Sequence, residues 1–213
     1  MRALLLGASI LGLAACPRPA DEPEQVDHSL VAVSPHVVLR TDPVGESGTT
    51  ATFALVDADN HGDRELLVRL GGDLVDAHGA VVGHLRPDEL RIPPGAKRTF
   101  ALVDDAVTAR PDATGATIAV ASATIPAGRA PMRVTDGHVY LDQGRAVVAA
   151  YVVNDSDLAG KAIVIAGFHD AKGNPMTRPW SVFQLGAGAK QTAQFVGPPG
   201  SKDAYIYVGE IAY

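Results

Sequence analysis

Two stretches of this chain, residues 60–97 and 154–190, follow the same plan. Each begins with a polar turn headed by an asparagine, Asn60 or Asn154, and continues with an apolar run. An Asp-x-x-Gly turn follows at Asp76 or Asp170, and each stretch ends in Gly-Ala-Lys. The Asn-to-Asp spacing is 16 residues in both stretches (76 − 60 and 170 − 154), and the spacing from Asp to the Gly of Gly-Ala-Lys is 19 and 18 (95 − 76 and 188 − 170). This shared order indicates two copies of one supersecondary unit, which constrains the fold of the whole chain.

From residue 28 onward the sequence is typical of short strands. The runs are rich in Val, Leu and Thr and are separated by Gly, Asp, Asn or Pro. Beyond the first fifteen residues we find no convincing run of apolar residues at helical spacing. The predicted strands are 31–40, 50–56, 65–70, 81–85, 90–92, 99–103 and 117–122 in the first half, and 132–134, 138–141, 146–153, 161–168, 180–185, 191–196 and 204–211 in the second.

This pattern predicts an all-β protein. With six or seven short strands per copy, we expect two tandem immunoglobulin-like β-sandwich domains, residues 28–125 and 126–213. One larger sandwich that holds both copies is the alternative, because the length also allows it.

The start of the chain resembles a bacterial lipoprotein signal. Arg2 supplies a positive charge, and residues 3–13 form an apolar run that is too short to span a bilayer as a helix. The run ends in the lipobox-like motif Leu13-Ala14-Ala15-Cys16, whose small residues suit the cleft of a signal peptidase. We expect residues 1–15 to be removed as a signal peptide and the thiol of Cys16 to carry the lipid, palmitate included. An ordinary secretory signal and a retained anchor helix are the alternatives.

The residues after the motif predict a tether and a location. Residues 16–27 are proline-rich and acidic, so we expect the lipidated Cys16 to be followed by a disordered link to the folded part. The lipid would anchor the protein to a membrane of the bacterial cell envelope. In enteric bacteria an aspartate directly after the lipidated cysteine favours retention in the inner membrane. Position 17 is Pro instead, so we expect the protein in the outer membrane, facing the periplasm.

Charge and cysteine content exclude several classes of protein. The chain has 18 Lys and Arg against 24 Asp and Glu, a formal net charge of −6. It has no basic block, so it lacks the electrostatic footprint of nucleic-acid binding. Cys16 is its only cysteine, so after acylation none is left for a disulfide or a cysteine metal site.

The second copy carries a family resemblance. It contains, in order, Asn154, the stretch Phe168-His169-Asp170-Ala171-Lys172-Gly173, Trp180, Leu185, Gly188 and Ala204-Tyr205-Ile206-Tyr207. This order resembles the YcfL-type periplasmic lipoproteins and the FxLyD-type sandwich domains of envelope lipoproteins. The resemblance implies an immunoglobulin-like sandwich with an Asn-containing turn and an Asp-x-x-Gly hairpin, and it implies no catalytic residue. The first copy departs from the pattern, because its corresponding region, residues 84–88, has no aromatic side chain.

The motifs of catalysis and metal binding are incomplete. Residues 57–62 begin like a calcium loop, but His61 occupies the fifth position and Val68 the twelfth, where a bidentate Glu is needed. A Gly-x-Ser-x-Gly elbow does not occur. We therefore expect no catalytic residue, no metal and no cofactor, and we predict that the chain is not an enzyme. The histidines lack the close spacings of metal ligands, and we expect scattered surface imidazoles at His61, His78, His84, His138 and His169.

Two functional hypotheses follow. In the first, the protein is a non-catalytic, membrane-anchored envelope lipoprotein that acts as a structural module or binds an envelope protein through a sheet edge or face. In the second, it binds a small ligand or a glycan on an aromatic surface around Trp180. Contiguous exposure of the rings favours the second hypothesis, and burial in separate cores favours the first. For Trp180 itself we expect packing in a core or at a sheet edge rather than ligand stacking. The residues of the aromatic surface would be Trp180, Tyr140, Tyr151 and Tyr205.

Overall fold

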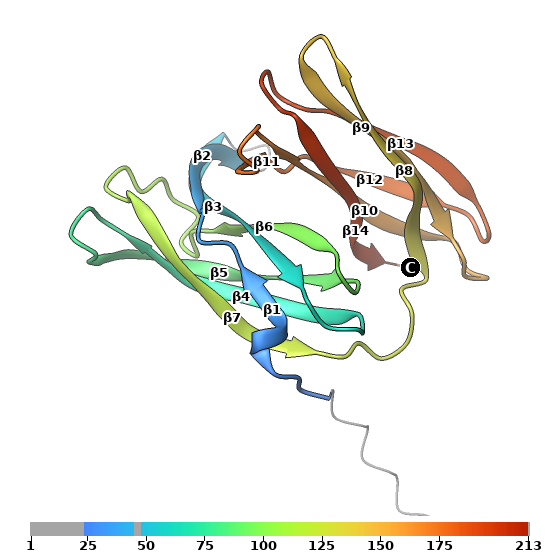
Figure 1. Cartoon of the computed structure of the whole chain (residues 1–213), viewed down its shortest axis with the longest axis horizontal. Coiled ribbons are helices and arrows are strands. Elements are labelled where there is room, and N and C mark those ends of the chain that lie inside the picture. The colour runs from blue at the N-terminus through green and yellow to red at the C-terminus, as the bar shows by residue number, and fades with distance from the viewer. Residues whose placement is uncertain (1–23, 45–47, 213) are drawn as a thin grey trace, which may run out of the picture.

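The computed structural model describes residues 24–44 and 48–212. These residues are almost entirely antiparallel β-structure, and Figure 1 shows the sheets as two stacked units, blue to green and yellow to red. No helix in this part of the chain is long and apolar enough to cross a membrane. The predicted signal motif and Cys16 lie outside the described residues.

In chain order the elements are η1 (His28–Leu30), β1 (Val31–Val33), β2 (Val38–Val44), β3 (Thr49–Asn60), β4 (Leu66–Val75), β5 (Val81–Ile92), β6 (Lys97–Val103), β7 (Gly115–Thr124), β8 (Met132–Asp142), β9 (Arg145–Asn154), β10 (Gly160–His169), β11 (Pro175–Thr177), β12 (Trp180–Leu185), β13 (Lys190–Val196) and β14 (Asp203–Ala212).

The first unit consists of two sheets that pack face to face. In one sheet, β3 is central, with β6 along one edge and β1 followed by β2 along the other. In the second sheet, β4 lies between β5 and β7. Alternate side chains of both sheets, such as Val56, Val68 and Phe100, point inward and form a fully buried core.

The second unit repeats this arrangement. Here β9 lies between β8 and β13, and β10 lies between β14 on one edge and β12 with the short β11 on the other. Strands β3, β4, β5, β6 and β7 therefore correspond in order to β9, β10, β12, β13 and β14. The prediction of an all-β, immunoglobulin-like sandwich fold is confirmed.

The asparagines that head the two repeats make the same buried contacts. Asn60 and Asn154 are both completely buried, and the Oδ1 of each accepts a hydrogen bond from the backbone N–H two residues later. The Nδ2 of each donates to a carbonyl four residues later and to a second carbonyl next to the following hairpin. These acceptors are Arg64 and Ile92 for Asn60 (2.7 and 2.8 Å), and Leu158 and Gly186 for Asn154 (2.7 and 3.0 Å). Each asparagine thus joins two turns at one end of its sandwich.

The Asp-x-x-Gly turns are also equivalent. The Oδ1 atoms of Asp76 and Asp170 each accept two backbone N–H groups, from the residues two and four positions later. Gly79 and Gly173 both have φ near +80°, a left-handed conformation that glycine adopts without a steric penalty. The repeat in the sequence is therefore a repeat of turn geometry.

The core of the first unit continues into the second. Ile165 and Tyr207 of the second unit are buried in the same apolar cluster as Val56 and Phe100. The interior of the second unit is formed by two smaller clusters, one around Met132 and Val164 and one around Phe168. The four sheets thus form two sandwiches, but one apolar cluster contains side chains of both and joins the two units.

Several segments differ from the expectation. The predicted strands 81–85 and 90–92 form one strand, β5, and the predicted strands 132–134 and 138–141 form one strand, β8. The predicted strand 31–40 is interrupted at residues 34–37, where Pro35 has no N–H to donate, and its two parts follow each other along the same edge of β3. Residues 24–26, expected in the tether, pair with the end of β7: the Val26 N–H donates to the Ala123 carbonyl at 3.0 Å. The short strand β11 is not among the predicted strands.

Replacing Asn60 or Asn154 by alanine leaves buried or partly buried backbone groups in two turns without their side-chain partner. Each such loss costs about 1–3 kcal/mol, so we expect each variant to lose about 2–4 kcal/mol of unfolding free energy in urea denaturation. Asn174→Ala is the control, because Asn174 is only partly buried and its Nδ2 donates to Asp170 alone (3.0 Å). We expect that control to lose less than about 1 kcal/mol. Equal losses in the three variants would contradict the role assigned to the asparagines.

Candidate functional site

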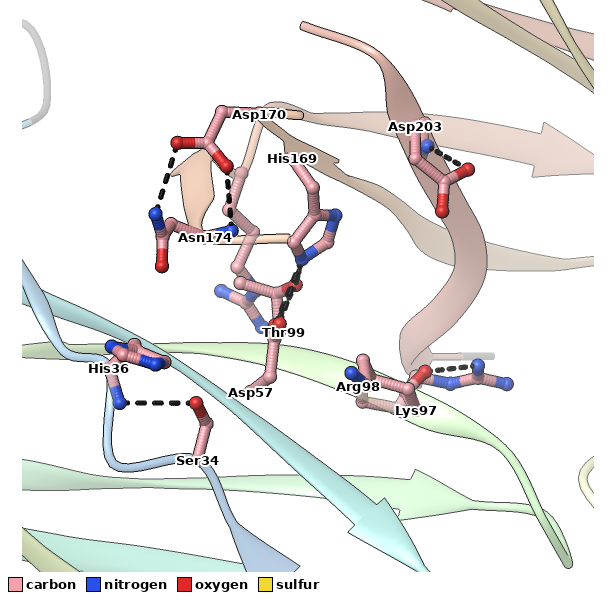
Figure 2. A network of polar contacts seen from close by, with 12 residues as sticks. Ser34, His36, Asp57, Lys97, Arg98, Thr99, His169, Asp170, Asn174 and Asp203 are labelled. Carbon is pink, nitrogen blue, oxygen red and sulfur yellow. Dashed lines mark hydrogen bonds and ion pairs between the residues drawn. The ribbon is translucent and has the colours of Figure 1, made fainter. Parts of the chain in front are cut away.

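A buried polar contact joins the two units. His169, at the end of β10, places its Nε2 2.9 Å from Oδ2 and 3.1 Å from Oδ1 of Asp57 on β3. Both side chains are almost completely buried. The hydroxyl of Thr99 on β6 donates to the same carboxylate at 2.7 Å, and Figure 2 shows the three side chains converging between the sheets.

Local sequence explains why these groups meet. Asp57 and Thr99 are register partners on β3 and β6, so their side chains lie on the same outer face of the first unit. Opposite them, β10 carries Gly167 two residues before His169. A Cβ atom at Gly167 would overlap the side chain of Thr99, so the close approach of the two units requires a glycine there.

Further polar contacts surround this centre. The hydroxyl of Tyr207 donates to the backbone carbonyl of Thr99. Arg178 pairs with Asp88 of the first unit at 3.2 Å, and its Nε lies 3.4 Å from the Tyr207 hydroxyl. Burial raises the pKa of the Tyr207 phenol, although the attraction of Arg178 and Arg98 opposes that rise. Tyr207 therefore remains a protonated donor in the interface.

The geometry of this contact fits a structural role in holding the two units together, and it differs from that of a catalytic triad. In a nucleophile–base–acid chain the hydroxyl and the carboxylate bind opposite nitrogens of the imidazole ring. Here both groups lie on the Nε2 side of His169: the Thr99 hydroxyl donates to Asp57 at 2.7 Å and also lies 3.4 Å from Nε2. The Nδ1 of His169 is buried without a partner among the described residues, and the ring packs edge-on against Tyr205, with centroids 5.1 Å apart.

A cleft of about 830 Å³ opens between the two units beside these contacts. Its lining has a formal charge of +1 (four arginines minus three carboxylates), whereas the whole chain has −6. Three of the arginines are paired with carboxylates: Arg91 with Glu65 at 3.1 Å, Arg178 with Asp88 at 3.2 Å, and Arg133 with Asp155 at 2.6 Å. The arginines are Arg91, Arg98, Arg133 and Arg178, and the carboxylates of the lining are Glu65, Asp88 and Glu89.

One side of the cleft is a ladder across three strands. Trp180 on β12 is the register partner of Ile165 on β10, and Ile165 is the partner of Tyr207 on β14. The three side chains lie on the same face, and the outer two are separated by two strand spacings, about 10 Å. The guanidinium carbon of Arg98 lies 4.7 Å from the centre of the Tyr207 ring. Trp180, Ile165, Tyr207 and Arg98 therefore form a continuous wall of the cleft.

The structure separates the four predicted aromatic contact residues. Trp180 and Tyr205 lie on the sheet face of the second unit that packs toward the first. Tyr140 and Tyr151 lie on the outer face of the other sheet, because the alternate residues of β9 form the inner core. The two pairs of rings thus point away from opposite sides of one sandwich and do not form one platform.

Two expectations about single residues need correction. Trp180 lies on the edge strand β12, as one form of the expectation had it, but it is not packed: 61% of its surface is exposed, because the first unit covers Ile165 and Tyr207 and leaves the indole open to the cleft. His169 was expected to be a surface imidazole, but it is 2% exposed. The signal for its partner was present in the sequence: Asp57 interrupts the otherwise apolar and small run from Phe53 to Ala58.

The described residues contain no group of three or more His, Cys, Asp or Glu side chains that could hold a metal ion. The stretch that begins like a calcium loop is instead the end of β3. There Asp57 faces His169, and Asp59 pairs with Lys97 at 3.7 Å.

Comparison with known proteins does not identify a family for this chain. Neither a protein-family model nor a curated protein matches the chain, so the resemblance to the YcfL and FxLyD types stays a prediction. Among solved structures, the chain is similar to the transglutaminase of red sea bream, with 11% identity and a TM-score of 0.21 over 78% of this chain and 27% of that one. It is also similar to the tandem CBM22-1–CBM22-2 domains of Xyn10C from Paenibacillus barcinonensis, with 6% identity and a TM-score of 0.14 over 90% and 92%. The chain spans about a quarter of the transglutaminase, and neither similarity supports a functional assignment.

Replacing Asp57 by alanine removes the acceptor of Thr99 and the partner of His169. Two buried polar groups then lose their partners, so we expect a loss of about 2–4 kcal/mol in urea denaturation and a larger radius of gyration in X-ray scattering. Asp59→Ala is the matched control, because Asp59 lies on the same face of β3 but is partly exposed and pairs with Lys97 at 3.7 Å. We expect that control to lose at most about 1 kcal/mol without expansion. If both variants behave alike, Asp57 does not hold the units together.

Proposed function

We propose that this protein is a non-catalytic lipoprotein of the bacterial cell envelope that binds a protein partner in the cleft between its two sandwich units. The lipid on Cys16 anchors it to a membrane, the outer membrane in this proposal, and the folded part faces the periplasm. The residues that reach from Cys16 to the first strand would carry the cleft away from the lipid surface.

The exposed indole of Trp180 is the observation that carries this proposal. Trp180 is the only tryptophan of the chain, and a side chain of this size is usually buried in a soluble protein. In this structure it lies at the open side of a concave surface rimmed by arginines. Tryptophan and arginine are the residues most often found at the energetic centre of protein interfaces, where a partner excludes water from them. The buried contacts around Asp57 and His169 support the proposal, because they hold both walls of the cleft in place.

A small ligand or a glycan is the second candidate, and the size of the cleft favours it. Ligand pockets have volumes of about 300–1,000 Å³, and this cleft has about 830 Å³. In that case the indole of Trp180 would stack on a ring of the ligand. Tyr140 and Tyr151 would take no part, because they lie on the opposite face of the second unit.

Photo-crosslinking from position 180 tests the proposed function. We expect a photoreactive residue in place of Trp180 to capture one envelope protein reproducibly in intact cells, identified by mass spectrometry. The same residue at Leu141 is the control, because Leu141 is also exposed (57%) but belongs to a different sheet of the second unit. Equal capture from both positions, or none from position 180, would count against a protein partner in the cleft.

Replacement of Cys16 by serine tests the anchor. The thiol is the only acylation site that the motif offers, so we expect Cys16→Ser to remove labelling by a palmitate analogue and to move the protein from the membrane fraction to the periplasmic fraction. A Ser29→Ala variant, changed outside the motif, is expected to stay lipidated. Persistent membrane association of Cys16→Ser without labelling would point to a retained anchor helix instead.

A further inference from the structure

Arg98 differs from the other arginines of the cleft in its charge partners. Arg91, Arg133 and Arg178 each pair with a carboxylate, whereas no carboxylate within the described ranges pairs with Arg98. Its Nη1 donates to the backbone carbonyl of Lys97 at 2.8 Å, a contact visible in Figure 2. Its Nε is buried and has no partner among the described residues. One guanidinium of the cleft therefore has an unused donor and no ion-pair partner among the described residues, with Glu65 acting on it only at longer range.

The surroundings of Arg98 compensate this charge only in part. The ring of Tyr207 lies 4.7 Å from the guanidinium carbon, and such a cation–π contact contributes up to about 2 kcal/mol when it is desolvated. Removing an ion from water without a counter-charge costs several kcal/mol. Consistent with this cost, burial lowers the pKa of the Arg98 guanidinium. An anion in the cleft would supply the missing counter-charge.

We propose that the cleft binds a carboxylate-bearing ligand, with the carboxylate at Arg98 and an apolar group against Trp180. The inference rests on the proposed function and names the chemical class of what the cleft receives. A guanidinium offers parallel N–H donors that match the two oxygens of a carboxylate. The wall from Tyr207 to Trp180 crosses three strands and spans two strand spacings, about 10 Å, so the ligand combines an acid at one end with a ring or an aliphatic group at the other.

The carboxylates that line the cleft have cationic partners other than Arg98, so they do not take the place of this anion. Glu65 accepts a hydrogen bond from Arg91 at 3.1 Å, and Asp88 pairs with Arg178 at 3.2 Å. Glu89 is exposed and lies directly across from Arg69 in the register of β4 and β5. Each carboxylate of the lining thus has a cationic neighbour of its own, whereas Arg98 forms no ion pair among the described residues and has only the longer-range attraction of Glu65.

The required chemistry has two sources. A partner protein can present an Asp or Glu side chain next to an apolar residue, and a free small acid can present the same groups. The blocked dipeptide N-acetyl-Phe-Asp-amide and phenylacetate represent these two sources. Phenylacetamide has the shape of phenylacetate without its charge.

Trp180 itself is the reporter for the test. Because it is the only tryptophan, the selectively excited tryptophan fluorescence of the full-length lipidated protein in detergent reports on the cleft, without a contribution from the five tyrosines. We expect phenylacetate to change the emission saturably and to bind at least tenfold more tightly than phenylacetamide. Hydrogen bonds to charged groups contribute about 1.5–3 kcal/mol, so Arg98→Gln should weaken phenylacetate binding at least tenfold. Arg145→Gln, a change at an exposed arginine outside the cleft, should leave binding unaltered.

The variants also separate binding from folding. Arg98→Lys keeps the charge and should retain part of the affinity, and the circular dichroism of each variant shows whether it is folded. Equal affinity for acid and amide, no saturable change with either acid, or unaltered binding in folded Arg98→Gln would overturn the inference. Tighter binding of the dipeptide than of phenylacetate assigns the carboxylate to a protein segment, and the reverse order assigns it to a small acid. Specific crosslinking from position 180 without any acid binding would overturn this inference alone and leave the proposed function standing.

Discussion

The buried contact between Asp57 and His169 determines how the two units of this protein lie together. Each side chain belongs to a different unit, and each has lost its contact with water. A buried carboxylate without partners is costly, so the free energy of Asp57 depends on the approach of β10. Gly167 permits that approach, and the apolar contacts of Ile165 and Tyr207 extend it into a continuous core. The interface is therefore specific in its polar centre and apolar around it.

The cleft is a consequence of this docking. On the sheet face of β10, β12 and β14, Ile165 and Tyr207 are buried against the first unit, whereas Trp180 on the edge strand β12 is open. The same packing brings Arg98 from the first unit over the ring of Tyr207 from the second. An apolar group and a cation from different sandwiches thus share one wall. Neither unit alone would present this combination.

The repeated fold was readable from the sequence, and the interface was not. The turns at Asn60, Asn154, Asp76 and Asp170 use local hydrogen bonds, so their spacing predicts the sandwich that the structure shows. The strands around them follow from apolar and β-branched composition. In contrast, His169 and Asp57 are 112 residues apart, and their pairing depends on how two folded units dock. The exposure of Trp180 was not predictable for the same reason, since it depends on how far the first unit covers the sheet face of the second.

The central claim is that the buried contacts around Asp57 and His169 hold the two units in one arrangement. Double electron–electron resonance measures this directly, with spin labels on Val81→Cys in the first unit and Leu141→Cys in the second, in a Cys16→Ser background that leaves no other thiol. Both positions are exposed, so the labels disturb no core. We predict a single narrow distance distribution. A broad distribution, with units that move independently, would contradict the account, because the cleft would then have no fixed walls.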